Sequence, residues 1–137
     1  MILDKRIRIY GNTEHRDGIR NENAQSQTFV NQVRKRYPDL LIMHIKNEGK
    51  KTKAQADFDR SMGMLTGASD FIILGNPTFC LEMKNTDHTQ STISKQQIEF
   101  LVNASEQGCF ACVALGWEAA LSAVEDWLIV ANKNILL

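Results

Sequence analysis

Apolar residues recur along the chain at two spacings, one typical of helices and one typical of strands. Where they stand three or four positions apart, as Phe29, Val30 and Val33 do, the pattern predicts a helix. The predicted helices span residues 21–37, 53–62, 91–107 and 116–132. Short apolar runs bounded by turn residues predict strands. The predicted strands span residues 7–10, 39–45, 70–75, 78–84 and 109–115.

Turn and cap residues mark where several of these elements begin and end. Asn21 is a candidate N-cap for the first helix, and Pro38 is its stop signal. The Gly-Asn-Pro sequence at 75–77 predicts a hairpin turn. Helices that alternate with short strands predict an α/β fold with a short mixed β-sheet flanked by helices. The polar residues 1–20 are expected to form an N-terminal arm or edge element, and residues 21–137 a single domain.

Composition is that of a soluble globular protein, because 43% of the 137 residues are hydrophobic and 23% are charged. No apolar run reaches the roughly 18 residues that a membrane span needs. The first residues lack the apolar stretch of a secretory signal. Three cysteines, an odd number, do not suit a disulfide framework, so we expect a cytoplasmic protein. Cys109 and Cys112 form a C-x-x-C motif, but inside an apolar strand, which favours core packing over a redox or zinc site.

The net charge of zero hides an uneven distribution along the chain. Residues 1–60 hold 13 Lys and Arg against 8 Asp and Glu, whereas residues 61–137 hold 3 against 8. A basic half can meet phosphate while an acidic half holds a metal ion. The alternative is that solvated charges segregate without a function.

Two acids and a lysine stand in the strands of the predicted hairpin. If the turn is centred on Asn76, paired residue numbers sum to 152, and Asp70 faces Glu82. Opposed like charges in an antiparallel pair destabilise it, and a shared Mg²⁺ or Mn²⁺ ion accounts for such a pair. Lys84 lies on the same face as Glu82, where an ammonium can hold a phosphate oxygen or orient a water. The alternative is a surface hairpin whose polar face is in water, and a one-residue bulge would break this register.

These residues carry a resemblance to a known family. Asp70 followed by Glu82-Met83-Lys84 resembles the Asp…Glu-x-Lys core of the PD-(D/E)xK nuclease superfamily. The wider motifs are "NEG" at 47–49, "GMLTGASDFIIL" at 63–74, "FCLEMK" at 79–84 and "ISKQQIEFL" at 93–101. Their order resembles the VRR-NUC (virus-type replication-repair nuclease) family over residues 21–130, stand-alone forms of which occur in phages and bacteria. One departure is Ser69, where family members often have proline.

The resemblance implies a restriction-endonuclease-like core with a metal centre. Asp70 and Glu82 would ligate Mg²⁺ or Mn²⁺ together with the Met83 carbonyl, and Lys84 would be the catalytic lysine. A glutamate in the first helix completes the family's site, and Glu22 is the matching position.

Two of the carried-over positions have purely structural alternatives. An acid in the first turn of a helix, such as Glu22, is favoured by the helix dipole alone. Gln97 matches the family's helix glutamine, yet Ser94 and Gln97 also form a capping box. The two roles of Gln97 need not exclude one another.

A lysine-rich loop and one histidine are further candidates for DNA contacts. The loop holds Asn47 and four lysines, namely Lys46, Lys50, Lys51 and Lys53. It is expected to contact phosphate, and the alternative is a solvated surface loop. His44, at the end of a predicted strand, is a candidate for phosphate contact near the site, although a structural histidine is the favoured interpretation.

The hypothesis that follows is a metal-dependent endonuclease that cuts branched DNA. The stand-alone form resembles homodimers that resolve four-way (Holliday) junctions, and a two-fold dimer supplies the two symmetric cuts that this needs. The final helix could serve the dimer interface or simply pack in the core. Its apolar residues at helical spacing are Trp117, Leu121, Val124 and Leu128. The alternatives are a nickase, a flap- or end-processing nuclease of the same fold, and a non-catalytic DNA-binding module.

Overall fold

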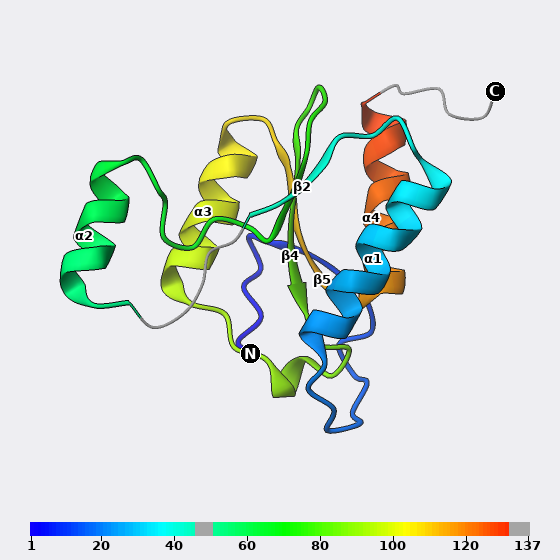
Figure 1. Cartoon of the computed structure of the whole chain (residues 1–137). Coiled ribbons are helices and arrows are strands. Elements are labelled where there is room, and N and C mark those ends of the chain that lie inside the picture. The colour runs from blue at the N-terminus through cyan, green and yellow to red at the C-terminus, as the bar shows by residue number, and fades with distance from the viewer. Residues whose placement is uncertain (46–50, 132–137) are drawn as a thin grey trace.

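The computed structural model describes residues 1–45 and 51–131 as one α/β unit (Figure 1). Its strands are β1 (Arg8–Tyr10), β2 (Ile42–His44), β3 (Phe71–Ile73), β4 (Phe79–Lys84) and β5 (Phe110–Leu115). Its helices are α1 (Glu22–Arg36), α2 (Lys53–Ser61), the 3₁₀ helix η1 (His88–Gln90), α3 (Lys95–Glu106) and α4 (Trp117–Val130). The predicted order of helices and strands is therefore confirmed.

The five strands form one mixed sheet in the order β1-β5-β4-β3-β2. β3 is antiparallel to both β2 and β4, whereas β5 is parallel to β4 and β1. In the hairpin, Phe71 pairs with Leu81 and Ile73 with Phe79, so paired numbers sum to 152 as predicted. The parallel β4–β5 pair requires a crossover connection, which α3 provides.

Both faces of the central strand β4 are covered, because all six of its residues are buried. Leu81 and Met83 belong to the larger core, which also holds Phe29 of α1 and Trp127 of α4. Leu121, Val124 and Leu128 of α4 lie in the same core, so the apolar face of the final helix packs internally. These residues therefore pack in the core and do not form an exposed surface for a dimer interface.

The opposite face of the sheet packs against α3 through a smaller core that includes Leu101, Val113 and Leu115. The predicted start of this helix at residue 91 is wrong, because the helix begins at Lys95. Residues 88–90 instead form the separate 3₁₀ turn, in which the Asp87 carboxylate accepts a hydrogen bond from the backbone N–H of Thr89.

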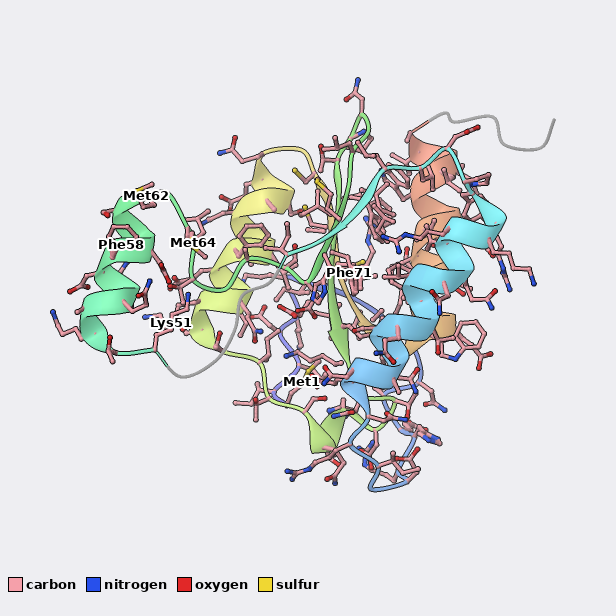
Figure 2. All side chains as sticks on the ribbon, in the orientation of Figure 1. Met1, Lys51, Phe58, Met62, Met64 and Phe71 are labelled. Carbon is pink, nitrogen blue, oxygen red and sulfur yellow. The ribbon has the colours of Figure 1, made fainter. Side chains whose placement is uncertain are left out.

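Helix α2 stands away from the sheet beyond α3 (Figures 1 and 2). All nine residues of α2 are described, and none of them is buried. Phe58 is 59% exposed, and Met62, just beyond the helix, is 70% exposed. The segment after α2 approaches the first turn of α3 at Gly67, whose φ is +86° and where a Cβ would lie 2.5 Å from the Gln96 carbonyl carbon. Only glycine permits this approach, which holds the chain that leads into β3 against α3.

The first twenty residues are attached to the domain through the segment after β4. The Asp87 carboxylate accepts hydrogen bonds from the backbone N–H groups of Asp17 (3.0 Å) and Gly18 (2.9 Å). The hydrogen bond from the Thr89 hydroxyl, together with these backbone bonds, holds the pKa of Asp87 well below its usual range. Within the described ranges, no helix has the length and apolar character needed to cross a membrane.

Candidate functional site

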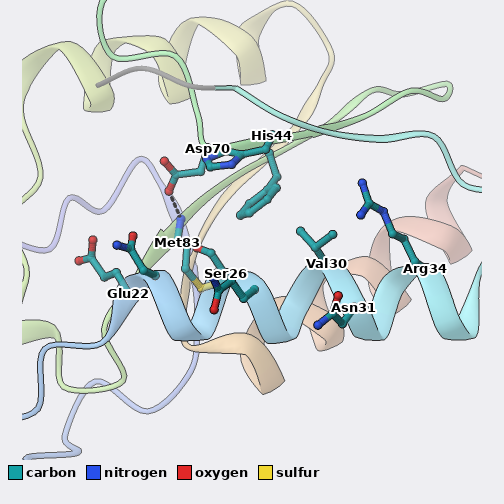
Figure 3. Close-up of a pocket in the computed structure, with 11 residues that line it drawn as sticks. Glu22, Ser26, Val30, Asn31, Arg34, His44, Asp70 and Met83 are labelled. Atoms are coloured by element: carbon teal, nitrogen blue, oxygen red, sulfur yellow. Dashed lines mark hydrogen bonds between the residues drawn. The ribbon is translucent and has the colours of Figure 1, made fainter. Parts of the chain in front are cut away.

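Asp70 and Glu82 lie side by side because each directly adjoins a residue of the Phe71–Leu81 pair, the final pair of the hairpin ladder. Phe71 pairs with Leu81, which places Asp70, the residue just before β3, beside Glu82. The Asp70 carboxylate turns toward β4 and accepts a hydrogen bond from the backbone N–H of Met83 at 2.8 Å (Figure 3). The antiparallel geometry that the sequence predicted therefore positions both acids.

Glu82 is a buried acid whose charge is poorly compensated. Glu82 is only 2% exposed, and its Oε1 has no hydrogen-bond partner among the described residues. Burial raises the pKa of Glu82 well above its usual range, the adjacent Asp70 raises it further, and Lys84 opposes this shift. A buried oxygen without a partner costs free energy, so this atom is available for a ligand that the protein itself does not supply.

Lys84 is held in place by two acceptors, one just before α3 and one in its first turn. Its Nζ donates to the Thr92 carbonyl oxygen at 2.5 Å and lies 3.5 Å from Gln97 Oε1. The residue is 4% exposed, so the ammonium is directed by these partners and not by bulk water. An ammonium has three N–H donors, and these contacts use two of them.

Gln97 forms the predicted capping box, and its part in the active site stays a prediction. Its backbone N–H bonds Ser94 Oγ at 3.0 Å, and its Oε1 accepts the Ser94 backbone N–H at 2.8 Å, which is a complete capping box. The same Oε1 is the atom that approaches Lys84. The cap at the start of α3 thus fixes an oxygen next to the lysine.

Glu22, the first residue of α1, is fixed by polar side chains that sequence reasoning missed. Its Oε1 accepts a hydrogen bond from Ser91 Oγ at 2.7 Å and one from Asn85 Nδ2 at 3.3 Å. Asn85 also accepts the backbone N–H of Asn21 at 2.7 Å, although Asn21 makes no side-chain cap of its own. The sequence signal for these partners was the run of polar residues directly after Lys84. This run follows a largely apolar strand.

The donor atoms present fit a hard divalent cation in chemistry but do not form a three-acid cluster. Asp70 and Glu82 supply carboxylate oxygens, and one buried Glu82 oxygen has no partner. Such oxygens are the ligands that Mg²⁺ and Mn²⁺ prefer. Across residues 1–45 and 51–131, no group of three or more His, Cys, Asp or Glu is arranged to hold a metal ion. Glu22 lies in the same cleft as Asp70 without completing a three-acid group, so its role as a metal ligand stays a prediction. A metal bound by Asp70 and Glu82 would need further oxygen ligands, such as the Met83 carbonyl or water.

The residues that were predicted to contact DNA are divided between described and undescribed parts of the chain. Lys46, Asn47 and Lys50 lie outside the described residues. The Lys51 ammonium pairs with Asp59 at 2.5 Å, and that of Lys53 pairs with Asp57 at 3.1 Å. The structure does not bring these two lysines to the acids, and their contact with phosphate stays a prediction.

A cleft of about 710 Å³ opens beside the acids, between α1 and the ends of β2 and β3 (Figure 3). Glu22 and Asp70 line one end of it, and Arg34 lines the other. His44 also lines the cleft, and its ring stacks on Phe71 with centroids 4.9 Å apart. His44 is exposed and therefore is not a core histidine. Sequence reasoning did not anticipate that α1 would form a wall of this cleft.

The two cysteines of the C-x-x-C motif differ in environment. Cys112 is fully buried in the larger core, and burial raises the pKa of its thiol. Cys109 precedes β5 and is half-buried. Cys112 therefore packs in the core, as the favoured interpretation of this motif predicted.

The mixed sheet, the helices on its two faces and the acids at the β3–β4 hairpin define an α/β fold of the restriction-endonuclease-like class. Among solved structures, the chain is similar to a VRR_NUC domain protein, with a TM-score of 0.55 and 17% identity over 80% of this chain and 89% of that one. The chain thus has the VRR-NUC fold that its motifs predicted. No model of a protein family matches the sequence. No curated protein matches it either.

Proposed function

We propose that the protein is a metal-dependent endonuclease that hydrolyses DNA phosphodiester bonds. The observation that carries this proposal is the pairing of Asp70 with the buried Glu82, with Lys84 on the same face of β4. A structural hairpin gains nothing from placing two acids side by side and burying one of them. The likeness in fold to a protein named for a VRR_NUC domain supports the same reaction class.

Each residue of this constellation has a distinct task in the proposed reaction. Asp70, Glu82 and the Met83 carbonyl would hold Mg²⁺ or Mn²⁺, which lowers the pKa of a water and neutralises charge on the phosphate. Lys84 directs its remaining N–H donor toward the reacting phosphate oxygen or the attacking water. Gln97 and the Thr92 carbonyl keep the ammonium in position. Glu22, held by Ser91 and Asn85, contributes a further carboxylate at the edge of the site.

The test is conversion of supercoiled plasmid to nicked or linear DNA in Mg²⁺ or Mn²⁺. The wild-type protein is expected to cut and Asp70→Asn to be inactive, because the substitution removes the charge of a metal ligand while keeping its shape. Glu99→Gln is the matched control, since Glu99 is an exposed acid of α3 whose only ion pair among described residues is a long one with Lys95 (3.9 Å). Equal activity of wild type and Asp70→Asn would remove the site assignment.

The finer proposal is that the substrate is branched DNA and that a homodimer resolves four-way junctions. One chain carries one Asp70–Glu82 pair, whereas resolution requires two opposed cuts, which a two-fold dimer provides. A panel of labelled junctions, flaps, splayed arms and duplexes identifies the preferred shape, and sedimentation gives the oligomeric state. A monomer that cuts flaps but ignores junctions would support the flap-nuclease alternative. DNA binding without cleavage in either metal would support a non-catalytic module.

We also propose that the lysine-rich loop contacts phosphate. Binding should then weaken steeply with salt, and Lys50→Ala with Lys51→Ala should flatten the log–log slope by about two units if both ammonium groups contact phosphate. Because Lys51 pairs with Asp59, a reduction of about one unit would assign the contact to Lys50 alone.

A further inference from the structure

Of the residues in the proposed site, Glu22, Asp70 and Met83 line the cleft along α1. The rest of its α1 wall consists of residues three or four positions apart, which therefore lie on one face of the helix. From Glu22 to Arg34 this wall is about 18 Å long at about 1.5 Å per residue. That is the length of about five stacked nucleotides of one strand, and of fewer if the strand is extended.

Polar groups that have no partner among the described residues line this wall. Asn23, Gln27 and Asn31 follow one another at intervals of four residues, and all three are exposed. Within the part of the chain that the structure describes, neither these amides nor the Arg34 guanidinium makes a hydrogen bond or an ion pair. Each amide offers two N–H donors and one carbonyl acceptor, which matches the mixed donors and acceptors of a base edge.

The opposite wall offers a flat ring. The His44 imidazole lies on Phe71 with an interplanar angle of 29°, and Phe71 is itself buried in the core. The exposed imidazole is therefore supported from one side and open to a second planar group. Nucleic-acid bases stack on such supported rings in proteins that bind single strands.

The lining of the cleft is poor in cations and includes the acids Glu22 and Asp70. Among the described residues that line it, Arg34 is the single Lys or Arg. A surface that tracks duplex backbone relies on several cations, whereas unpaired bases are bound by aromatic rings and amide groups. We propose that this cleft binds a short unpaired stretch of a DNA strand, with one base on His44, base edges on the amides and a phosphate on Arg34. This inference rests on the proposed nuclease function, and it places the unpaired nucleotides beside the bond that is cut.

Binding measured without metal tests this site separately from cleavage. Fluorescence anisotropy in EDTA compares a labelled oligothymidylate with a duplex of the same length. His44→Ala and Arg34→Ala should each weaken binding of the single strand about tenfold and change duplex binding less than about twofold. His44→Phe should retain single-strand binding, because it keeps a flat ring. Lys35→Ala is the charge control, since Lys35 is exposed on the same helix but does not line the cleft.

The outcomes separate the cleft from the nuclease. The cleft proposal would be overturned if His44→Ala and Lys35→Ala weakened binding equally, or if the variants weakened binding of single strand and duplex equally. Either result would leave the nuclease proposal, which plasmid cleavage tests, unaffected. Selective loss of single-strand binding in a protein that cuts no DNA would support the cleft and remove the nuclease. In an active enzyme, a duplex with unpaired nucleotides beside the cut should be preferred over a nicked duplex, and His44→Ala should abolish that preference.

Discussion

One face of β4 carries Phe79, Leu81 and Met83, and the other carries Cys80, Glu82 and Lys84. Both faces are buried to nearly the same degree. The first packs against α1 and α4 and gains free energy from the apolar area that it removes from water. The second buries charge beside α3, where one Glu82 oxygen has no partner among described residues. Burial alone therefore does not distinguish the two faces of β4, whereas the charges on one face and the unpartnered Glu82 oxygen do.

The largest expected effect follows from replacing Lys84 on the charged face. Lys84→Ala should reduce cleavage about 10³-fold or more, because residues of one catalytic unit fail together. Its Mn²⁺ affinity should stay nearly unchanged, since an ammonium has no lone pair to donate. Single-turnover cleavage and calorimetry measure the two quantities. Loss of Mn²⁺ binding would show that Lys84 instead organises the carboxylates.

The opposite face should respond in stability and not in chemistry. Leu81→Ala, at the fully buried neighbour of Glu82, should lower the free energy of unfolding by about 2–5 kcal/mol through the cavity that it leaves. Urea denaturation measures this loss. Cleavage per folded molecule should change less than about threefold, because Leu81 lies on the face away from the acids. A large fall in that rate would mean that the two faces are not independent.

Glu82→Gln should increase stability when metal is absent. Because the pKa of Glu82 is raised in the folded chain, the unfolded chain loses this proton first, and stability falls as pH rises above about 4.5. Glutamine does not ionise, so at pH 8 in EDTA the variant should be more stable by about 1–3 kcal/mol. Added Mn²⁺ should stabilise the wild type and not the variant. Thermal unfolding across pH, with and without Mn²⁺, measures both; a variant less stable than wild type in EDTA would contradict the argument.

The smallest effect is expected at the support of Glu22. Ser91→Ala removes the 2.7 Å hydrogen bond to Glu22 and should reduce cleavage about tenfold, as loss of an outer support does in metal sites. Thr89→Ala is the control, because that hydroxyl in the same turn bonds Asp87 at 2.6 Å instead. Equal cleavage rates for the two variants would contradict a role of Glu22 in the site. Glu22 would then only stabilise the start of α1 through the helix dipole.

Sequence patterns predicted the parts of the site that depend on neighbouring residues. The turn at 75–77 set the register of the hairpin, and strand alternation then placed Asp70, Glu82 and Lys84 together. The capping box at Ser94 and Gln97 was likewise readable, because it spans three residues. The start of α3 was misjudged, since the polar residues before Ser94 resemble a first helical turn.

The sequence by itself determined which strands form, how the hairpin pairs and which face of β4 is charged, because these follow from local sterics and the two-residue period of a strand. Only the tertiary structure decided that Ser91 and Asn85 hold Glu22, that the Thr92 carbonyl and Gln97 hold Lys84, and that α1 forms a cleft with His44. Glu22 and its two partners are separated by more than sixty positions in the chain. Such contacts depend on how helices pack on the sheet, and that packing is settled by the whole core and not by any local pattern.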